Sequence, residues 1–195
     1  MKIAAIIPCY NEELTIKQVI CDIQKYCPKC EIYVFDNNSY DNSYNIAKET
    51  GAIVNKVSYQ GKGEVIRRAF ADIDSDIYIM VDADMQYDLS EINNFINYFT
   101  ENKLDMLNIS REVVDETVHR KGHSFGNMML TGFANFLFGK KFNDMLSGYR
   151  IFSKRFVKSF PANSRGFEIE TELTIYALQM RLPIDEVSAK YIKRP

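Results

Sequence analysis

Two carboxylates and an amide are spaced two residues apart directly after an apolar run that ends at Val81. Asp82, Asp84 and Gln86 therefore place three oxygen-bearing side chains at the end of an expected strand. Magnesium and similar hard cations take such oxygen ligands, often together with the phosphates of a substrate. The alternative is a polar turn in which Asp84 or Asp88 caps the following helix. Both interpretations fit this segment on its own.

Polar and aromatic side chains also follow the first two apolar runs of the chain. Tyr10 and the backbone of Pro8 are expected to form one wall of a slot for a nucleotide base, followed by Glu12. Asp36 ends the second run and can accept hydrogen bonds from a base or a ribose. Asn11 can equally be the N-cap of a helix whose dipole favours the acidic residue after it. Because ligands of open α/β sheets bind beyond the carboxyl ends of the strands, these groups are expected to converge with the carboxylates above.

A lysine between two glycines opens a further expected helix. Lys62 lies between Gly61 and Gly63, near backbone N–H groups that favour an anion. The segment is not a P-loop, because Lys56 stands where that motif requires its first glycine and no Ser or Thr follows the lysine. Nor is it a dinucleotide fingerprint, because Ile66 occupies the third glycine position. The segment therefore indicates an anion and no particular cofactor.

The second half of the chain carries charged residues around a glycine turn and at a helix start. Asp144 and Arg150 flank the turn in the segment DMLSGYR, where such a pair can also simply brace its loop. Glu168, Glu170 and Glu172 follow further on. If all three are helical, the first and third share one face and Glu170 points away, so they cannot all serve one site.

Short runs rich in Ile and Val alternate with stretches of helical period, which is typical of βαβ units on a largely parallel sheet. Strands are expected at residues 2–8, 31–36, 52–56, 77–82 and 106–110. Helices are expected at residues 12–26, 43–50, 63–74, 90–100, 128–138 and 168–181. The first helix would bury Leu14, Val19, Ile20 and Ile23 on one face. The pattern predicts a single α/β domain over residues 1–195 with two halves, 1–110 and 111–195, of which the first resembles a nucleotide-binding fold.

The composition excludes several classes of protein. The 195 residues are 46% hydrophobic and 26% charged, which is too apolar for a disordered chain. Lys and Arg number 24 against 26 Asp and Glu, so the formal charge of −2 gives no basic field for nucleic acid. No apolar run is long enough to span a bilayer, and none resembles a signal peptide, so the chain is expected in the cytoplasm.

Histidine and cysteine residues do not complete a metal-binding pattern. His119 and His123 are four residues apart without a nearby acidic or thiol partner, so surface or phosphate-contacting histidines are favoured over metal ligands. The four cysteines include one CxxC pair at Cys27 and Cys30, but no second pair stands at zinc-binding spacing. Free thiols are therefore expected.

Taken together, the order of the segments resembles the GT-A nucleotide-sugar glycosyltransferases of family 2, and within them the polyprenyl-phosphate glycosyltransferases, which include the dolichol-phosphate mannose synthases. The matching segments are IIPCYNEE, DNNSYD, GKGEVIRRA, VDADMQYD, ISR, DMLSGYR, EIETEL and YIKRP. They run from residue 6 to the end of the sequence. No segment is specific by itself, whereas their joint order is.

The resemblance implies a GT-A fold, which is a Rossmann-like and mostly parallel sheet, and a role for each matching position. The implied donor-binding residues are Pro8, Tyr10, Glu12, Asp36, Lys62 and Asp82. Asp82, Asp84 and Gln86 match the DxDxQ element, which would hold Mg²⁺ or Mn²⁺ with Asp84 and Gln86 directly on the metal. Asp144, Arg150, Glu170 and Glu172 match elements beside the transferred sugar, and Arg111 and Arg194 match arginines that meet an acceptor phosphate.

The chain departs from the family pattern at three places. The family carries two adjacent acids after its second strand, whereas the second position here is Asn37. A further basic residue is expected between the ISR and DMLSGYR segments, and Arg120 or Lys121 is the candidate. The sequence ends at Pro195, where the family continues into an interfacial or transmembrane segment. The full-length protein is therefore expected at the cytoplasmic face of a membrane.

The implied reaction is transfer of a sugar, with inversion, from a nucleotide-sugar donor to a lipid phosphate. A phosphate monoester is largely ionised at neutral pH and needs no strong base, whereas a glycan hydroxyl acceptor would need one, for which Asp144 and then Glu172 are candidates. A nucleotidyltransferase is disfavoured because the N-terminal segment lacks a glycine-rich basic loop. A non-catalytic nucleotide-binding module would not need the converging carboxylates and arginines. The sequence does not distinguish uracil from guanine, and it does not name the sugar or the oligomeric state.

Overall fold

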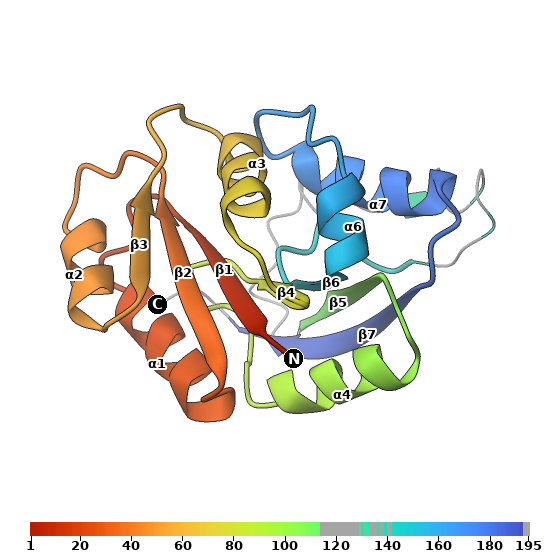
Figure 1. Ribbon diagram of the computed structural model, residues 1–195, viewed down its shortest axis with the longest axis horizontal. Helices are drawn as coiled ribbons and strands as arrows, with labels where there is room; N and C mark the ends of the chain where they lie inside the picture. The colour runs from red at the N-terminus through yellow and green to blue at the C-terminus, as the bar shows by residue number, and fades with distance from the viewer. Residues whose placement is uncertain (114–128, 130, 133–135, 137–138, 140–141, 193–195) are drawn as a thin grey trace.

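The computed structural model describes residues 1–113, 129, 131–132, 136, 139 and 142–192. These residues form one seven-stranded sheet with the order β3-β2-β1-β4-β6-β5-β7 (Figure 1). All neighbouring strands are parallel except β6, which runs antiparallel to both β4 and β5. The strands are β1 (Ile3–Cys9), β2 (Cys30–Asp36), β3 (Ile53–Lys56), β4 (Ile77–Met80), β5 (Met106–Val113), β6 (Arg150–Ser153) and β7 (Ile184–Tyr191).

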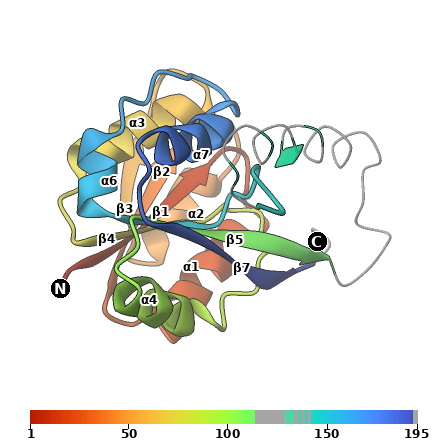
Figure 2. The same cartoon turned by 90° about the vertical axis from the view of Figure 1, so that its right-hand side faces the viewer.

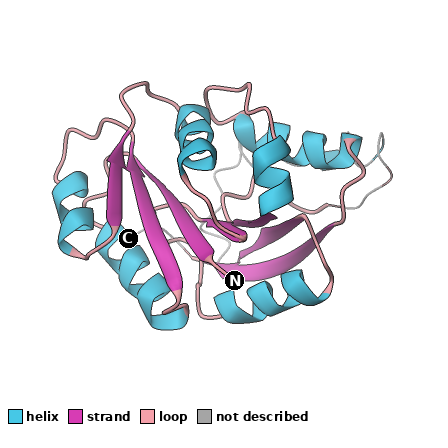
Figure 3. Ribbon diagram, viewed as in Figure 1, coloured by secondary structure: helices cyan, strands magenta, loops and turns pink. Residues whose placement is uncertain are grey.

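Helices cover both faces of this sheet, as Figures 1 and 3 show. One face carries α1 (Ile16–Tyr26), α2 (Ser43–Glu49) and α4 (Ile92–Glu101). The other carries α3 (Lys62–Asp72), α6 (Lys154–Ser159) and α7 (Ile169–Gln179). The sequence-based prediction of a single α/β domain with a mostly parallel sheet is therefore confirmed.

The alternation of side chains along each central strand supplies both hydrophobic cores. In β1, Ala5 and Ile7 join the core under α1 and α4, whereas Ala4 and Ile6 join the core under α3, α6 and α7. The same alternation holds in β4, where successive residues face opposite helical layers and all are buried. Strands buried on both faces read as continuous apolar runs, which is why the central strands were evident from the sequence.

The five strands expected from the sequence are present, but β6 and β7 were not expected. β6 is only four residues long and follows a turn-rich segment. β7 is an edge strand whose sequence IDEVSAKY carries three charged residues among its eight and no continuous apolar run, and it pairs along the whole length of β5 (Figure 2). Such a strand is specified by its neighbour more than by its own propensity.

The start of the first helix differs from the prediction. α1 begins at Ile16 after the N-cap Thr15, so the expected start at Glu12 and the N-cap role of Asn11 are wrong. Asn11 instead adopts a left-handed conformation with φ of 54°, and its Oδ1 accepts a hydrogen bond from Tyr40 N at 3.0 Å. Leu14, which was expected in the core, therefore lies outside the helix and is 85% exposed.

The alternative in which Asp84 or Asp88 caps the helix after β4 is also wrong. α4 begins after the N-cap Glu91 without a side-chain cap. Asp88 Oδ1 accepts a hydrogen bond from Ser90 N at 2.9 Å in the turn before the helix, and Asp84 Oδ1 accepts one from Gln86 N at 3.2 Å. Both carboxylates thus organise their own loop.

Most of the helix expected at residues 128–138 lies outside the described residues, although Met129, Thr131, Gly132 and Phe136 are helical. In the part of the chain that is described, we find no helix of the length and apolarity needed to cross a bilayer.

Candidate active site

A buried lysine connects three elements at the carboxyl edge of the sheet. Lys62, at the start of α3, places its Nζ 2.5 Å from Asp82 Oδ1 after β4 and 2.5 Å from Glu170 Oε1 on α7. The lysine and glutamate side chains are only 6% and 9% exposed. Burial alone would lower the pKa of Lys62, but the two carboxylates outweigh that effect and raise it. The ammonium is therefore fully charged at neutral pH.

The glycines on either side of Lys62 allow a distant loop to pack onto the start of α3. A Cβ at Gly61 would overlap the carbonyl of Arg165, and one at Gly63 would overlap the carbonyl of Ser164. Gly61 also has φ of 135°, which side-chain-bearing residues rarely adopt. The GKG pattern is thus explained by close packing around the lysine.

Asn37 holds the loop that leads to Lys62. Its Nδ2 donates hydrogen bonds to the carbonyls of Val57 and Tyr59 at 3.1 and 2.7 Å, and its Oδ1 accepts one from Gly61 N at 2.8 Å. The side chain is buried; its hydrogen bond to Val57 is buried as well, and the other two are partly buried. An acid at this position could not donate to two carbonyls, which gives a structural reason for the departure from the family pattern at residue 37.

Asp82 lies directly against the glycine turn that precedes β6. A Cβ at Gly148 would overlap the carboxylate of Asp82, so only glycine permits this approach. Gly148 N donates to the hydroxyl of Tyr87, which pairs with Ser147 Oγ at 3.0 Å, and Ser147 Oγ donates in turn to the carbonyl of Ile109. Burial raises the pKa of Tyr87, so its hydroxyl keeps its proton. The acidic loop and the DMLSGYR segment are therefore fixed against each other.

The donor set after β4 suits a hard divalent cation. Asp82 and Asp84 supply carboxylate oxygens and Gln86 an amide oxygen, all partly accessible at the strand end. Gln86 is oriented by β7, because its Nε2 donates to the carbonyl of Ile192 at 3.1 Å and its Oε1 accepts from Tyr191 Oη at 2.8 Å. Among the described residues no group of three or more His, Cys, Asp or Glu side chains is placed to hold a metal. The fit is therefore to a cation that completes its shell with substrate phosphates and water, as Mg²⁺ commonly does.

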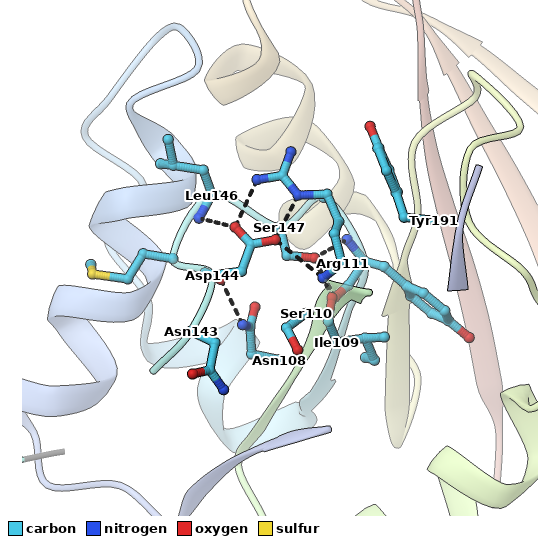
Figure 4. A network of polar contacts seen from close by, with 12 residues as sticks. Asn108, Ile109, Ser110, Arg111, Asn143, Asp144, Leu146, Ser147 and Tyr191 are labelled. Carbon is cyan, nitrogen blue, oxygen red and sulfur yellow. Dashed lines mark hydrogen bonds and ion pairs between the residues drawn. The ribbon is translucent and has the colours of Figure 1, made fainter. Parts of the chain in front are cut away.

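Arg111, near the end of β5, forms a bidentate ion pair with Asp144 (Figure 4). The guanidinium Nε and Nη2 lie 2.6 and 2.7 Å from the two carboxylate oxygens. The amide of Leu146 also donates to Asp144, and the ring of Tyr191 lies 5.5 Å from Arg111 Cζ. The ion pair raises the pKa of Arg111 against the effect of burial. Figure 4 shows the guanidinium and the carboxylate facing one another.

Two further polar side chains, Asn108 on β5 and Glu186 on β7, hold the segment that carries Asp144. Asn108 Nδ2 donates to the carbonyl of Asp144 at 2.8 Å and to Glu186 Oε2 at 2.7 Å. Glu186 on β7 also accepts from the backbone of Asn143 at 2.8 Å. The position of the ion pair is therefore set by β5 and β7 together.

Arg150 is completely buried beneath the glycine turn. It donates to the carbonyls of Ser147 and Met145 and to Thr174 Oγ1 on α7. Burial lowers the pKa of Arg150, an effect that Glu170 nearby opposes. These contacts brace the DMLSGYR loop and give Arg150 no path to solvent in this conformation.

The three glutamates around the start of α7 have separate partners. Glu170 faces Lys62, whereas Glu172 accepts hydrogen bonds from the amides of Asn163 and Ser164 at 2.9 and 2.7 Å. Glu168 is the N-cap residue and accepts from the amide of Gly166. As expected, the three do not serve one site, and Glu170 is the member that joins the lysine cluster.

The expected base-binding residues surround the ends of β1 and β2. Asp36 is 2% exposed; its Oδ2 accepts from Ser39 N at 3.4 Å, and its Oδ1 has no hydrogen-bond partner among the described residues. Tyr10 is 45% exposed and meets the ring of Tyr40 edge-on. Pro8 lies within β1, beside Phe35, which precedes Asp36 on β2. Glu12 is partly exposed and accepts from the hydroxyl of Thr15.

Several expectations fall outside the described residues. Arg194 and either Arg120 or Lys121 were expected to meet an acceptor phosphate, and His119 and His123 were expected at the surface or near phosphate. The four cysteines are free thiols, as expected. The sequence interpretation did not single out Asn37 as a loop brace or Tyr191 as a partner of Gln86 and Arg111, because both roles depend on pairings between distant strands.

The sequence comparison places the chain in a family. The sequence model of glycosyl transferase family 2 matches residues 4–160, and the chain belongs to that family. Protein RfbJ of Shigella flexneri is 48% identical over 122 residues, which are 62% of this chain and 95% of that protein. The dolichol-phosphate mannosyltransferase of Pyrococcus furiosus is 27% identical over 187 residues, which are 90% of this chain and 53% of that one. Other relatives are also longer, since the matched regions make up 62% and 48% of two of them.

The structural comparison agrees on the fold. The glucosyl-3-phosphoglycerate synthase of Mycobacterium tuberculosis, solved with Mn²⁺, UDP and glucosyl-3-phosphoglycerate, superposes with a TM-score of 0.76 at 22% identity. The match covers 100% of this chain and 73% of that one. The GT-A fold expected from the sequence is thereby confirmed.

Replacing Lys62 by Met should leave Asp82 and Glu170 facing each other without a counter-charge. Breaking a buried ion pair in this way costs about 3–5 kcal/mol, which urea unfolding would measure. Adding Glu170→Gln to the variant should recover part of that loss. Lys154→Met removes the solvent-exposed pair with Asp74 and should cost less than about 1 kcal/mol. Equal losses for the two lysine variants would contradict a structural role for the buried cluster.

Replacing Asn37 by Asp should loosen the loop before Lys62, because a carboxylate cannot donate to the two carbonyls. The cost should be about 1–3 kcal/mol of unfolding free energy at pH 7. Burial and the two carbonyls should raise the pKa of the new carboxyl in the folded state above its unfolded-state value of about 4. The loss of unfolding free energy should therefore grow as the pH rises from about 4 through the folded-state pKa. Asn38→Asp makes the same change at an exposed neighbour and should show neither effect. A pH-independent loss for Asn37→Asp would contradict this account.

Proposed function

We propose that the chain transfers a sugar, with inversion, from a nucleoside-diphosphate donor to a lipid phosphate, using Mg²⁺ or Mn²⁺. One observation carries the proposal. Arg111 on β5 pairs with Asp144, and this pair is connected to the acidic loop after β4 by the hydrogen bond from Gly148 N to Tyr87 and by Tyr191, whose hydroxyl binds Gln86 and whose ring lies 5.5 Å from Arg111 Cζ. A donor diphosphate and an acceptor phosphate would thus be held by neighbouring parts of the same edge.

On the donor side, Asp84 and Gln86 would hold the cation, with Asp82 beside them. When bound, such a cation acts as a Lewis acid that offsets the charge of the departing diphosphate. Lys62 keeps the carboxylate of Asp82 in place and adds positive charge beneath the loop. Asp36 would accept a hydrogen bond from the base or ribose through Oδ1, which has no hydrogen-bond partner among the described residues.

On the acceptor side, Arg111 would orient the phosphate. Its Nε and Nη2 bind Asp144, while Nη1 has no partner among the described residues. The side chain is 28% exposed, so the guanidinium is partly accessible to a ligand while the ion pair is kept. A phosphate monoester carries most of its second charge at neutral pH, so it can attack the anomeric carbon when aligned and needs no strong base. Arg120 and Arg194 are proposed to assist.

A glycan hydroxyl acceptor is the second candidate, and it would need a base. Asp144 is the nearest choice, but its carboxylate already accepts from Arg111 Nε and Nη2 and from two backbone amides. These four donors already occupy its oxygens, which leaves little room for the hydroxyl of an acceptor. Glu172 is bound to loop amides. These contacts favour the phosphate acceptor, and so does the relative named as a dolichol-phosphate mannosyltransferase.

Turnover of a panel of UDP- and GDP-sugars tests the proposal, with and without a polyprenyl phosphate. We expect release of nucleoside diphosphate that requires both the lipid phosphate and a divalent cation. Transfer to a glycan acceptor in the absence of lipid phosphate would contradict the acceptor assignment. Binding without turnover for the whole panel would contradict the enzyme assignment. The Mn²⁺ and UDP bound to the structural neighbour make these the first probes to use.

Asp84→Asn tests the cation site with a change of one atom. In the wild type, UDP or GDP with Mn²⁺ should raise the thermal midpoint more than either alone, since the folded state binds the pair. The variant should lose most of the Mn²⁺-dependent increment while its ligand-free midpoint stays within a few degrees. Asp88→Asn changes a neighbouring carboxylate that binds its own turn and should retain the increment. An intact Mn²⁺ increment in Asp84→Asn would place the cation elsewhere.

A further inference from the structure

We infer that Tyr191, at the end of β7, is a positioning residue that connects the cation-binding loop to the acceptor-binding arginine. The inference rests on the function proposed above. It follows from the two ends of one side chain, because the hydroxyl binds Gln86 and the ring faces Arg111. No other described side chain has a recorded contact with both of these residues.

The hydroxyl end fixes the amide of Gln86. Tyr191 Oη donates to Gln86 Oε1 at 2.8 Å, and Gln86 Nε2 donates to the carbonyl of Ile192 at 3.1 Å. These two contacts together settle which end of the amide carries the oxygen. The backbones are tied as well, since Ile192 N donates to the carbonyl of Gln86 at 2.9 Å. The amide oxygen therefore has a set direction and a second lone pair for a cation.

The ring end supports Arg111. Arg111 pairs with Ala189 in the parallel β5–β7 register, so Tyr191, two residues further along, projects from the same face of the sheet. Arg111 Cζ lies 5.5 Å from the ring centroid, within the range of a cation–π contact. The ring of Tyr87 meets Tyr191 edge-on with centroids 5.0 Å apart. The ring is thus held in place and limits the positions that the guanidinium can adopt.

The two ends have separable consequences. Removing the hydroxyl leaves the ring beside Arg111 but removes the hydrogen bond to the amide oxygen of Gln86, so it should weaken cation binding alone. Removing the ring should release both groups. A residue that only stabilised the fold would affect both kinds of binding in proportion to the lost stability.

Two substitutions separate these possibilities in the chain as it stands. Mn²⁺ affinity is measured by electron paramagnetic resonance of free Mn²⁺ with saturating UDP or GDP, and acceptor affinity by calorimetry with farnesyl phosphate. Tyr191→Phe should weaken Mn²⁺ binding roughly 2- to 10-fold, as expected for one hydrogen bond, and leave farnesyl phosphate binding unchanged. Tyr191→Leu should weaken Mn²⁺ binding similarly and farnesyl phosphate binding roughly 2- to 10-fold.

Tyr98→Phe is the matched control, because it removes a tyrosine hydroxyl that donates to Asp185 at the other end of β7. It should alter neither affinity. Unchanged Mn²⁺ binding in Tyr191→Phe overturns the inference, and so does an equal loss of both affinities that tracks a lower thermal midpoint. A wild-type chain that binds no Mn²⁺ with either nucleotide overturns the proposed function, and this inference with it.

Discussion

A buried ammonium between two carboxylates is the constraint around which the functional edge of this protein is built. Lys62 joins the start of α3, the loop after β4 and the start of α7, three elements far apart in the sequence. A charge this deep is tolerated only when paired, so each of the three elements must keep its place for the others to be stable. The flanking glycines follow from this, because the loop from α6 to α7 must pack directly on the lysine's backbone.

The functional edge is also supported by β7, the outermost strand beside β5, whose sequence does not predict a strand. Glu186 supports the segment of Asp144, and Tyr191 and Ile192 hold Gln86. One strand therefore supports both the cation-binding loop and the acceptor side.

Much of the fold could be predicted from the sequence because its central strands are buried on both faces. β1, β2 and β4 read as apolar runs, and the polar residues after them mark the functional edge. β6 and β7 could not be predicted in the same way, since β6 is very short and β7 carries charged residues that interrupt any apolar run, so its strand conformation depends on its pairing with β5. The start of α1 was misplaced because Asn11 and Leu14 belong to a turn held by contacts to the segment after β2.

The candidate site, like the fold, has some features that the sequence predicts and others that depend on contacts between distant segments. The carboxylates after β4 were accessible as a sequence pattern, because their chemistry is carried by residue type and local spacing, whereas Arg111 on β5 was singled out by the family resemblance. The structure added what pairs them: Asn37 bracing the loop of Lys62, the contact of Gly148 with Asp82, and the reach of Tyr191 between Gln86 and Arg111. These are contacts between residues distant in the chain, and a single sequence contains no direct record of them.

The proposed function requires a divalent cation and a nucleoside diphosphate to meet at the carboxyl end of β4. Diffraction from crystals grown with Mn²⁺ and UDP or GDP, recorded with the anomalous signal of manganese, locates both. We expect an anomalous peak for a manganese ion bound by Asp84 and by diphosphate oxygens, with the base beside Asp36. A manganese peak at another place, or a diphosphate bound away from this loop, would contradict that function.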